Sequence, residues 1–173
     1  LRQLDDIFSG RVKTVFSTVD AIEHYSSHAD LVVGAVLIPG AAAPKLLNRE
    51  QIAAMKPGSV LVDVAIDQGG CFETSRATTH QDPVYVIDNV VHYCVANMPG
   101  GVARTSTMAL NNATLPFGLA LANKGPVKAM LDDAHLRAGL NTHEGKVTYK
   151  AVVDALGEKL NLTYVPAEEA LRR

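Results

Sequence analysis

Several features that would define the class of this protein are scarce or missing from its sequence. The only two cysteines, Cys71 and Cys94, form neither a CxxC pair nor a zinc-ligand spacing. The formal net charge of -2 offers no basic surface for nucleic acid and no acidic tail. No apolar run approaches the roughly 20 residues that a membrane-spanning helix needs. We therefore expect no nucleic-acid or membrane partner, and two free thiols in a reducing cytoplasm.

The start of the sequence also lacks expected features. The first ten residues, LRQLDDIFSG, carry charges from the beginning and do not form a signal peptide. Residue 1 is leucine, and Leu1, Leu4, Ile7 and Phe8 already have the spacing of one helix face. We expect a cytoplasmic location and a sequence that begins inside a longer protein.

Apolar runs and helical patterns alternate over the first 70 of the 173 residues. Short apolar or β-rich runs predict strands at residues 12–17, 30–40 and 59–66, and helical spacing predicts helices at 18–29 and 48–56. The strands at 30–40 and 59–66 carry apolar residues on both faces rather than in alternation, apart from Asp63 inside the second run, which is typical of strands covered on both faces. The pattern predicts an α/β fold with an open parallel sheet.

The later part of the sequence has a different character. Two more strands are predicted at residues 83–88 and 90–96. A long helix follows at 105–125, with Thr105 or Ser106 as its N-cap, Gly125 at its end and a kink at Pro116. A loop-rich stretch and a helix at 150–160 complete the chain. We predict two domains, residues 1–104 and 105–173.

Loops rich in glycine and proline follow the predicted strands. They read FSTVD, LIPGAAAP, IDQGG and ANMPGG. In an open parallel sheet, ligands bind beyond the carboxyl ends of the strands, and glycine permits close approach of a flat or phosphorylated ligand. These loops predict a binding crevice, unless the glycines and prolines serve only as turn formers.

Asp67 is the strongest candidate for chemistry. A carboxylate at the end of a buried strand is expected to face the crevice, where it could accept a proton or bind a ligand, although it could also cap the next turn. Asp63 is expected in mid-strand with hydrogen bonds to neighbouring backbone. The six histidines show no metal-ligand spacing. Residues 105–107 could bind a phosphate or simply cap a helix. No nucleophile elbow, P-loop or GxGxxG motif occurs.

Three long blocks resemble the cofactor-binding half of the bacterial L-alanine dehydrogenase family. They are ADLVVGAVLIPGAAAPKLL, MKPGSVLVDVAIDQGGCFETSRATTHQDPVY and YCVANMPGGVARTSTMALNNATLPF, and the resemblance extends from about Leu1 to Gly157. It implies an incomplete Rossmann-type domain that binds NAD, followed by a long helix and part of a substrate domain. The implied reaction is reversible oxidation of L-alanine to pyruvate and ammonia with hydride transfer to NAD. The family also implies a homo-oligomer, a hexamer.

The resemblance assigns roles to individual positions. Asp67 matches the active-site aspartate beside the nicotinamide. The positions that match cofactor contacts are Ser17, Val36, Leu37, Val64, Ala65, Ile66, Arg76, Val95, Ala96, Asn97 and Met98. Gly69 and Gly70 would keep space for cofactor and substrate.

Parts of the family pattern do not occur in these residues. The glycine-rich fingerprint is expected just before Leu1, and the substrate domain with its Arg, Lys and His residues is expected further upstream. We therefore expect a C-terminal part that has low NAD affinity and is inactive alone. Two alternatives remain, namely an NAD-binding component of a proton-translocating transhydrogenase and an inactive interaction module. The helix at 105–125 would be the partner surface of such a module.

Overall fold

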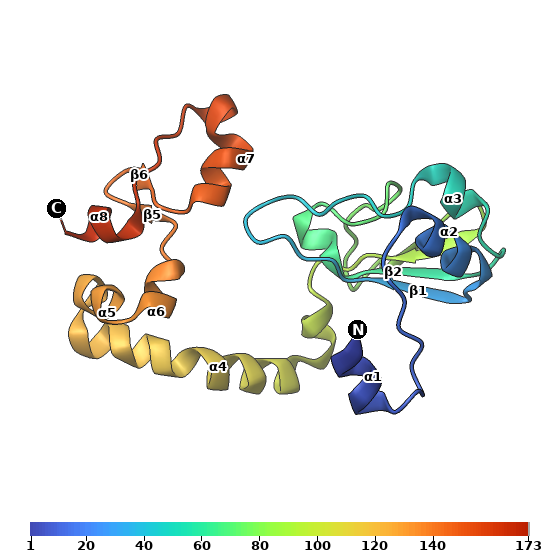
Figure 1. The fold of residues 1–173 in the computed structure, drawn as a ribbon, viewed down its shortest axis with the longest axis horizontal. Coiled ribbons are helices and arrows are strands. Elements are labelled where there is room, and N and C mark those ends of the chain that lie inside the picture. The colour runs from blue at the N-terminus through green and yellow to red at the C-terminus, as the bar shows by residue number, and fades with distance from the viewer. Residues whose placement is uncertain (173) are drawn as a thin grey trace. The chain divides into compact units, whose positions relative to one another are not determined.

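The computed structural model describes residues 1–172, which divide into two compact units. Residues 1–37 and 42–98 form the first unit, and residues 38–41 join the chain from Pro99 onward in the second. Figure 1 shows the elements of both units along the chain.

The first unit is an α/β fold with a four-stranded sheet. Its elements are α1 (Arg2–Phe8), α2 (Val19–His28), β1 (Leu31–Gly34), α3 (Arg49–Ala53), β2 (Val60–Asp63), the 3₁₀ helix η1 (Val64–Gln68), β3 (Val84–Ile87) and β4 (Val90–Tyr93). The strand order is β1-β2-β4-β3, with β1, β2 and β4 parallel and β3 antiparallel to β4. The predicted fold class is confirmed, with one antiparallel edge strand added to the parallel sheet.

Local sequence signals set the ends of these elements. The Thr18 hydroxyl accepts from the Ala21 amide at 3.1 Å and caps α2. Asn48 and Gln51 form a reciprocal capping box at the start of α3. Asp88 and Asn89, with φ of 50° and 62°, make the tight turn between β3 and β4. Asn and Asp tolerate this left-handed region better than other non-glycine residues, so the hairpin follows directly from the sequence.

One face of the sheet carries the core. Leu61, Asp63, Val90 and His92 point to this face and are all fully buried. Ile52 of α3 and Ile22 of α2 belong to the same cluster, so both helices lie over this face (Figure 1). A loop layer that includes Leu47 and Phe72 covers the rest of it.

The opposite face of the sheet is open in the described chain, so the prediction that both faces are covered is wrong. Leu31, Val33 and Val86 lie on it with 58%, 56% and 62% of their surface exposed. The continuous apolar pattern correctly marks residues suited to burial. Because α2 and α3 lie on the same face, neither helix covers these residues.

The predicted strand at residues 12–17 is also wrong, because this segment has no regular structure. A strand requires a neighbour that pairs with its backbone N–H and C=O groups. The described sheet ends at β1, and residues 12–17 do not pair with that edge. The β-rich composition alone is therefore insufficient to form a strand here.

The second unit is mostly helical. Its elements are η2 (Met98–Val102, whose first residue belongs to the first unit), α4 (Ala103–Lys124), α5 (Pro126–Asp132), α6 (Ala134–Ala138), the hairpin strands β5 (Thr142–His143) and β6 (Lys146–Val147), α7 (Lys150–Leu160) and α8 (Ala167–Leu171). The predicted helix at 150–160 is confirmed as α7. Among residues 1–172, none of the helices combines the length and apolarity required to cross a bilayer.

The long helix α4 is confirmed, but its predicted cap is wrong. The helix begins at Ala103, and its N-cap position, Val102, makes no side-chain cap bond. Ser106 already lies inside the helix, and its hydroxyl donates back to the Pro99 carbonyl at 2.9 Å. Gly125 ends the helix with φ of 78°, as predicted, and Pro116 lies within it.

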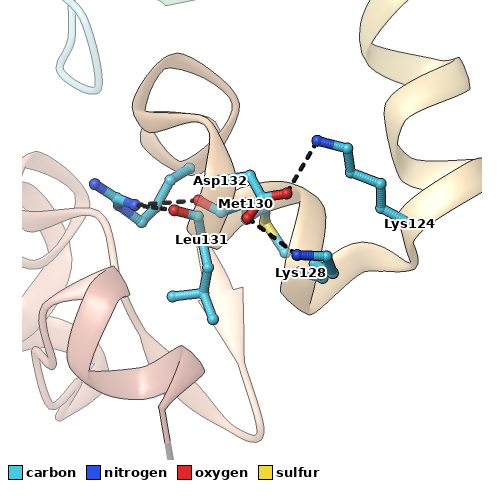
Figure 2. A network of polar contacts seen from close by, with 6 residues as sticks. Lys124, Lys128, Met130, Leu131 and Asp132 are labelled. Atoms are coloured by element: carbon cyan, nitrogen blue, oxygen red, sulfur yellow. Dashed lines mark hydrogen bonds and ion pairs between the residues drawn. The ribbon is translucent and has the colours of Figure 1, made fainter.

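A polar network holds the turn from α4 into α5 and α6. Lys124 and Lys128 both donate to the Asp132 carboxylate (Figure 2). The hydrogen bond from Lys124 is the main reason that the pKa of Asp132 is lowered. Arg137 Nη1 donates to the carbonyl oxygens of Met130 and Leu131, both at 3.2 Å. Main-chain carbonyls at the end of α5 thus gain donors from α6.

His92 gives the first prediction, a pH dependence of stability. Burial lowers the pKa of His92 from 6.5. Its Nδ1 donates to the Val90 carbonyl at 2.9 Å, and the Thr74 hydroxyl lies 2.7 Å from Nε2. The unfolded ring therefore binds a proton in a pH range where the folded ring does not. The free energy of unfolding should fall as pH drops below 6.5, by at most about 1.4 kcal/mol per pH unit.

Urea unfolding at a series of pH values between about 5.5 and 7.5, roughly one unit either side of the ordinary histidine pKa, measures this slope. His92→Gln should flatten it, whereas the matched variant of the exposed His135, His135→Gln, should leave it unchanged. Equal slopes for His92→Gln and the parent protein would show that His92 is not the responsible group.

Candidate functional site

A pocket of about 380 Å³ lies beyond the carboxyl ends of β1 and β2. The loop after β1 contributes Ala35, Val36 and Leu37, and η1 contributes Val64, Ala65, Asp67 and Gln68. Parallel strands bring these two segments to the same edge of the sheet. The walls are mainly aliphatic, and Asp67 and Gln68 provide the polar side chains. The sequence-predicted positions Val36, Leu37, Val64, Ala65 and Asp67 therefore meet in one pocket.

Asp67 reaches the pocket from a 3₁₀ turn, not from a strand end. The predicted strand at 59–66 stops at Asp63, and the chain then forms η1. Gly69 and Gly70 follow with φ of 88° and 75°, a region that glycine adopts without strain. The exposed Asp67 carboxylate lies at the pocket, where it can accept a hydrogen bond or a proton.

Asp63 ends β2 instead of lying in mid-strand, and it is fully buried. Its Oδ2 accepts from the Cys71 amide at 2.8 Å and from the Ser75 hydroxyl at 2.5 Å, and its Oδ1 accepts from the Cys71 thiol at 3.4 Å. The expected hydrogen bond to backbone is present, but it comes from a residue eight positions later. A buried carboxylate needs such donors, so the loop after η1 is tied to β2.

Ile66 and Arg76 belong to a second small cluster. Ile66 is buried beside Tyr85 and Cys94. The Arg76 guanidinium lies 3.9 Å from the centre of the Tyr85 ring, and that ring stacks on His92 at 4.9 Å. The Tyr85 hydroxyl accepts from the Arg76 amide at 2.8 Å and donates to the Thr74 carbonyl at 3.0 Å. Burial raises the pKa of Tyr85, so the hydroxyl stays protonated and keeps both bonds.

The loop after β4 does not line the pocket. Val95 is buried and bridges to Thr78, whereas Ala96 and Asn97 are exposed and Met98 is half-buried. His80 Nε2 donates to the Asn97 carbonyl at 2.6 Å and fixes this loop. The segment follows β4 at the same edge of the sheet, because β4 is parallel to β2.

Ser17 lies in a different hollow of about 220 Å³, beside Phe16, Ala21 and Tyr25. A larger hollow of about 540 Å³ lies next to α3, around Arg49, Glu73 and Asp88. Several of its charged groups already have partners, since Arg49 Nε lies 3.3 Å from the Asp88 carboxylate and the Glu73 carboxylate accepts from the main-chain amide of Arg49 at 2.7 Å. The pocket beside Asp67 is the better candidate, because it lies where a parallel sheet binds ligands.

Two further features of the site were not visible in the sequence. Ala35 and Gln68 line the pocket, and Lys45 donates to main-chain carbonyls of the turn that follows Gln68 in the chain. No motif marks a lysine that binds main chain, so no sequence signal could have identified Lys45. In the described part of the chain, no group of three or more His, Cys, Asp or Glu side chains could hold a metal ion.

Residues 1–150 match the family model described as alanine dehydrogenase/PNT, C-terminal domain. An alanine dehydrogenase of Halomonas elongata is 66% identical over 167 residues, covering 96% of this chain and 44% of the relative. Alanine dehydrogenase 2 of Staphylococcus aureus is 56% identical over 173 residues, covering 99% of this chain and 45% of that protein. The chain thus spans less than half the length of these relatives.

Two solved structures are also similar. An L-alanine dehydrogenase aligns with a TM-score of 0.78 and 44% identity, over 91% of this chain and 43% of that one. A transhydrogenase from Sinorhizobium meliloti aligns with a TM-score of 0.56 and 29% identity, over 79% of this chain and 36% of that one.

The thiol behind the pocket gives the second prediction. Burial, and then the charge of Asp63, raise the pKa of Cys71 to about 12, so roughly one thiol in ten thousand is ionised at pH 8. Cys94 is also fully buried. A thiol-specific disulfide reagent at pH 8 should therefore label neither cysteine in the folded protein and both in urea. Labelling of Cys71 within minutes under native conditions would contradict the burial and the raised pKa.

Proposed function

Because the chain belongs to the alanine dehydrogenase/pyridine nucleotide transhydrogenase family, we propose that it forms part of the cofactor-binding half of an NAD-dependent L-alanine dehydrogenase. The observation that most supports this proposal is the pocket at the ends of β1 and β2, which contains Asp67. The whole protein would oxidise L-alanine reversibly to pyruvate and ammonia.

The residues of the pocket suit NAD. The aliphatic side chains of Val36, Leu37 and Val64 offer apolar walls to the flat nicotinamide ring, and the small Ala35 and Ala65 leave room for it. Asp67 and Gln68 supply polar groups at the same pocket. When bound, NAD would take a hydride from the α-carbon of alanine.

Asp67 would manage protons at this pocket. Its carboxylate can accept a proton from the water that attacks the oxidised substrate, and it can hold that water in place by a hydrogen bond. The backbone supports this role, because η1 carries Asp67 between a buried strand end and a glycine turn. Arg76, fixed over Tyr85, would offer its positive charge to the anionic part of the cofactor.

The family membership also supports a second candidate, the NAD-binding component of a transhydrogenase. The similarity to a transhydrogenase structure favours it, although the identity of 29% is lower than the 44% to an L-alanine dehydrogenase. An assay of NAD reduction distinguishes the two candidates. An alanine dehydrogenase reduces NAD when L-alanine is added. A transhydrogenase component would require a second nucleotide and would not respond to L-alanine.

We also propose a homo-oligomer in the cytoplasm, a hexamer as the resemblance implies. The helix α4 supports association, because none of its side chains is buried within the described residues. Its large exposed apolar side chains are Met108, Leu110, Leu115, Phe117 and Leu119.

Asp67→Asn is the third prediction and tests the proposed function. In the full natural polypeptide, this variant should lower kcat for L-alanine oxidation by about 100-fold or more, since the amide cannot accept a proton. The dissociation constant for NAD should change less than about threefold, because the side-chain shape is kept. Stopped-flow absorbance of NADH and calorimetric titration of NAD measure the two quantities.

Asp6→Asn is the matched control, because Asp6 is an exposed aspartate on α1. It should leave both kcat and NAD binding unchanged. Full activity of Asp67→Asn would remove Asp67 from the mechanism. Absence of alanine-dependent NADH formation by the unaltered full polypeptide would reject the dehydrogenase assignment itself.

A further inference from the structure

The turn that follows Asp67 has an unusual set of donors for its carbonyl oxygens. The Gln68 carbonyl accepts from the Ala43 amide at 2.9 Å, and the Cys71 carbonyl accepts from the Leu46 amide at 2.7 Å. Between them, Gly69 and Gly70 both have positive φ, so their carbonyls do not follow the direction of a strand ladder. Neither of these two carbonyls pairs with a main-chain amide of the 43–47 segment.

The Lys45 side chain supplies the donor for both of these carbonyls. Its Nζ donates to the carbonyl oxygens of Gly69 at 2.7 Å and Gly70 at 2.8 Å, and also to Phe72 at 3.2 Å. One ammonium group therefore uses all three of its protons on a single turn. Together with the two main-chain bonds, it gives every carbonyl from residue 68 to residue 72 a donor in the 43–47 segment.

The amide side of the same turn is held by other groups. The Cys71 amide donates to the buried Asp63 carboxylate at 2.8 Å, and the Gly69 and Gly70 amides donate back to Ile66 and Ala65 at 3.0 and 3.1 Å. The turn thus lies between a cation on its carbonyl side and an anion on its amide side. Hydrogen bonds to charged groups are stronger than neutral ones, so this turn is held firmly.

We propose that Lys45 is a positioning residue that sets the place of Asp67 in the pocket. Asp67 lies on η1, and the turn bound by Lys45 begins two residues later. The inference rests on the proposed function for the role of Asp67. Loss of Lys45 removes a donor from the carbonyls of Gly69, Gly70 and Phe72, of which only Phe72 keeps another donor, the Ser75 amide, while the backbone bonds of Ala43 and Leu46 remain. The turn should therefore loosen locally while the sheet stays folded.

The fourth prediction tests the hydrogen bonds of Lys45 to the turn and requires no activity assay. Lys45→Met keeps the length of the side chain and removes its three donors. Hydrogen exchange of the Gly69, Gly70 and Cys71 amides should become at least about tenfold faster, with exchange in β1 and β2 unchanged. Lys56→Met is the matched control, because the Lys56 ammonium binds only Asp30 at the surface, at 2.9 Å.

Exchange at the turn equal to that of Lys56→Met would overturn the inference. If Lys45→Met also speeds hydrogen exchange in β1 and β2, the same measurement is made on Lys45→Gln, because the side-chain amide of glutamine keeps one donating group for the turn. Lys45→Arg should restore slow exchange, since a guanidinium can donate to adjacent carbonyls.

A double-mutant cycle then tests whether the effect reaches Asp67. In the full natural polypeptide, Lys45→Met should lower kcat about 10- to 100-fold, because small displacements of a catalytic group have effects of this size. The NAD dissociation constant should stay within about threefold. Lys45→Met should cause no further loss in the Asp67→Asn background, because the positioned group is already gone.

Losses that multiply in the double variant would show that Lys45 acts independently of Asp67 and would overturn the inference. Inactivity of the unaltered protein with L-alanine and NAD would instead reject the proposed function. The exchange experiment would still decide in that case whether Lys45 orders the turn beside the pocket.

Discussion

The buried carboxylate of Asp63 is the constraint on which the rest of the first unit depends. It ends β2 with no exposed surface and requires donors inside the protein. The Cys71 amide and the Ser75 hydroxyl meet that requirement and draw the chain back over the sheet. Gly70 is needed at this point, because a Cβ there would lie 2.7 Å from the Asp63 carboxylate. The buried carboxylate thus holds the turn that directly follows the pocket residues Asp67 and Gln68.

The loop layer over the sheet links the core to the pocket. Residues 43–47 run beside residues 68–73, with a parallel bridge between Leu47 and Phe72. This layer lies so close to β1 that a Cβ on Gly34 would collide with the Cys71 sulfur and lie 2.7 Å from the Phe72 ring. Ala65 belongs to the core and also lines the pocket, and Val36 packs against the core from the pocket wall. The pocket itself is open to solvent, since Leu37 and Val64 on its walls are 70% and 48% exposed.

The candidate site residues form three groups, and different parts of the fold hold each group in place. Val36, Leu37, Val64, Ala65 and Asp67 line one pocket, because parallel β1 and β2 end at the same edge. Arg76 is held separately over the Tyr85 ring. The residues from Val95 to Met98 follow β4 and are fixed through Thr78 and His80. Proximity in the sequence did not decide this grouping, whereas the order of strands in the sheet did.

The sequence by itself determined the elements whose signals are local. Thr18, Asn48 and Gly125 mark helix ends through short-range bonds or a left-handed φ, and apolar runs mark the strands at Leu31 and Val60. Tertiary structure decided the rest. Within residues 1–172, residues 12–17 have strand composition but no strand that pairs with them, and one face of the sheet has no covering layer. Lys45 likewise acquires its three carbonyl partners only from a segment some 25 residues away, and no local pattern specifies such long-range contacts.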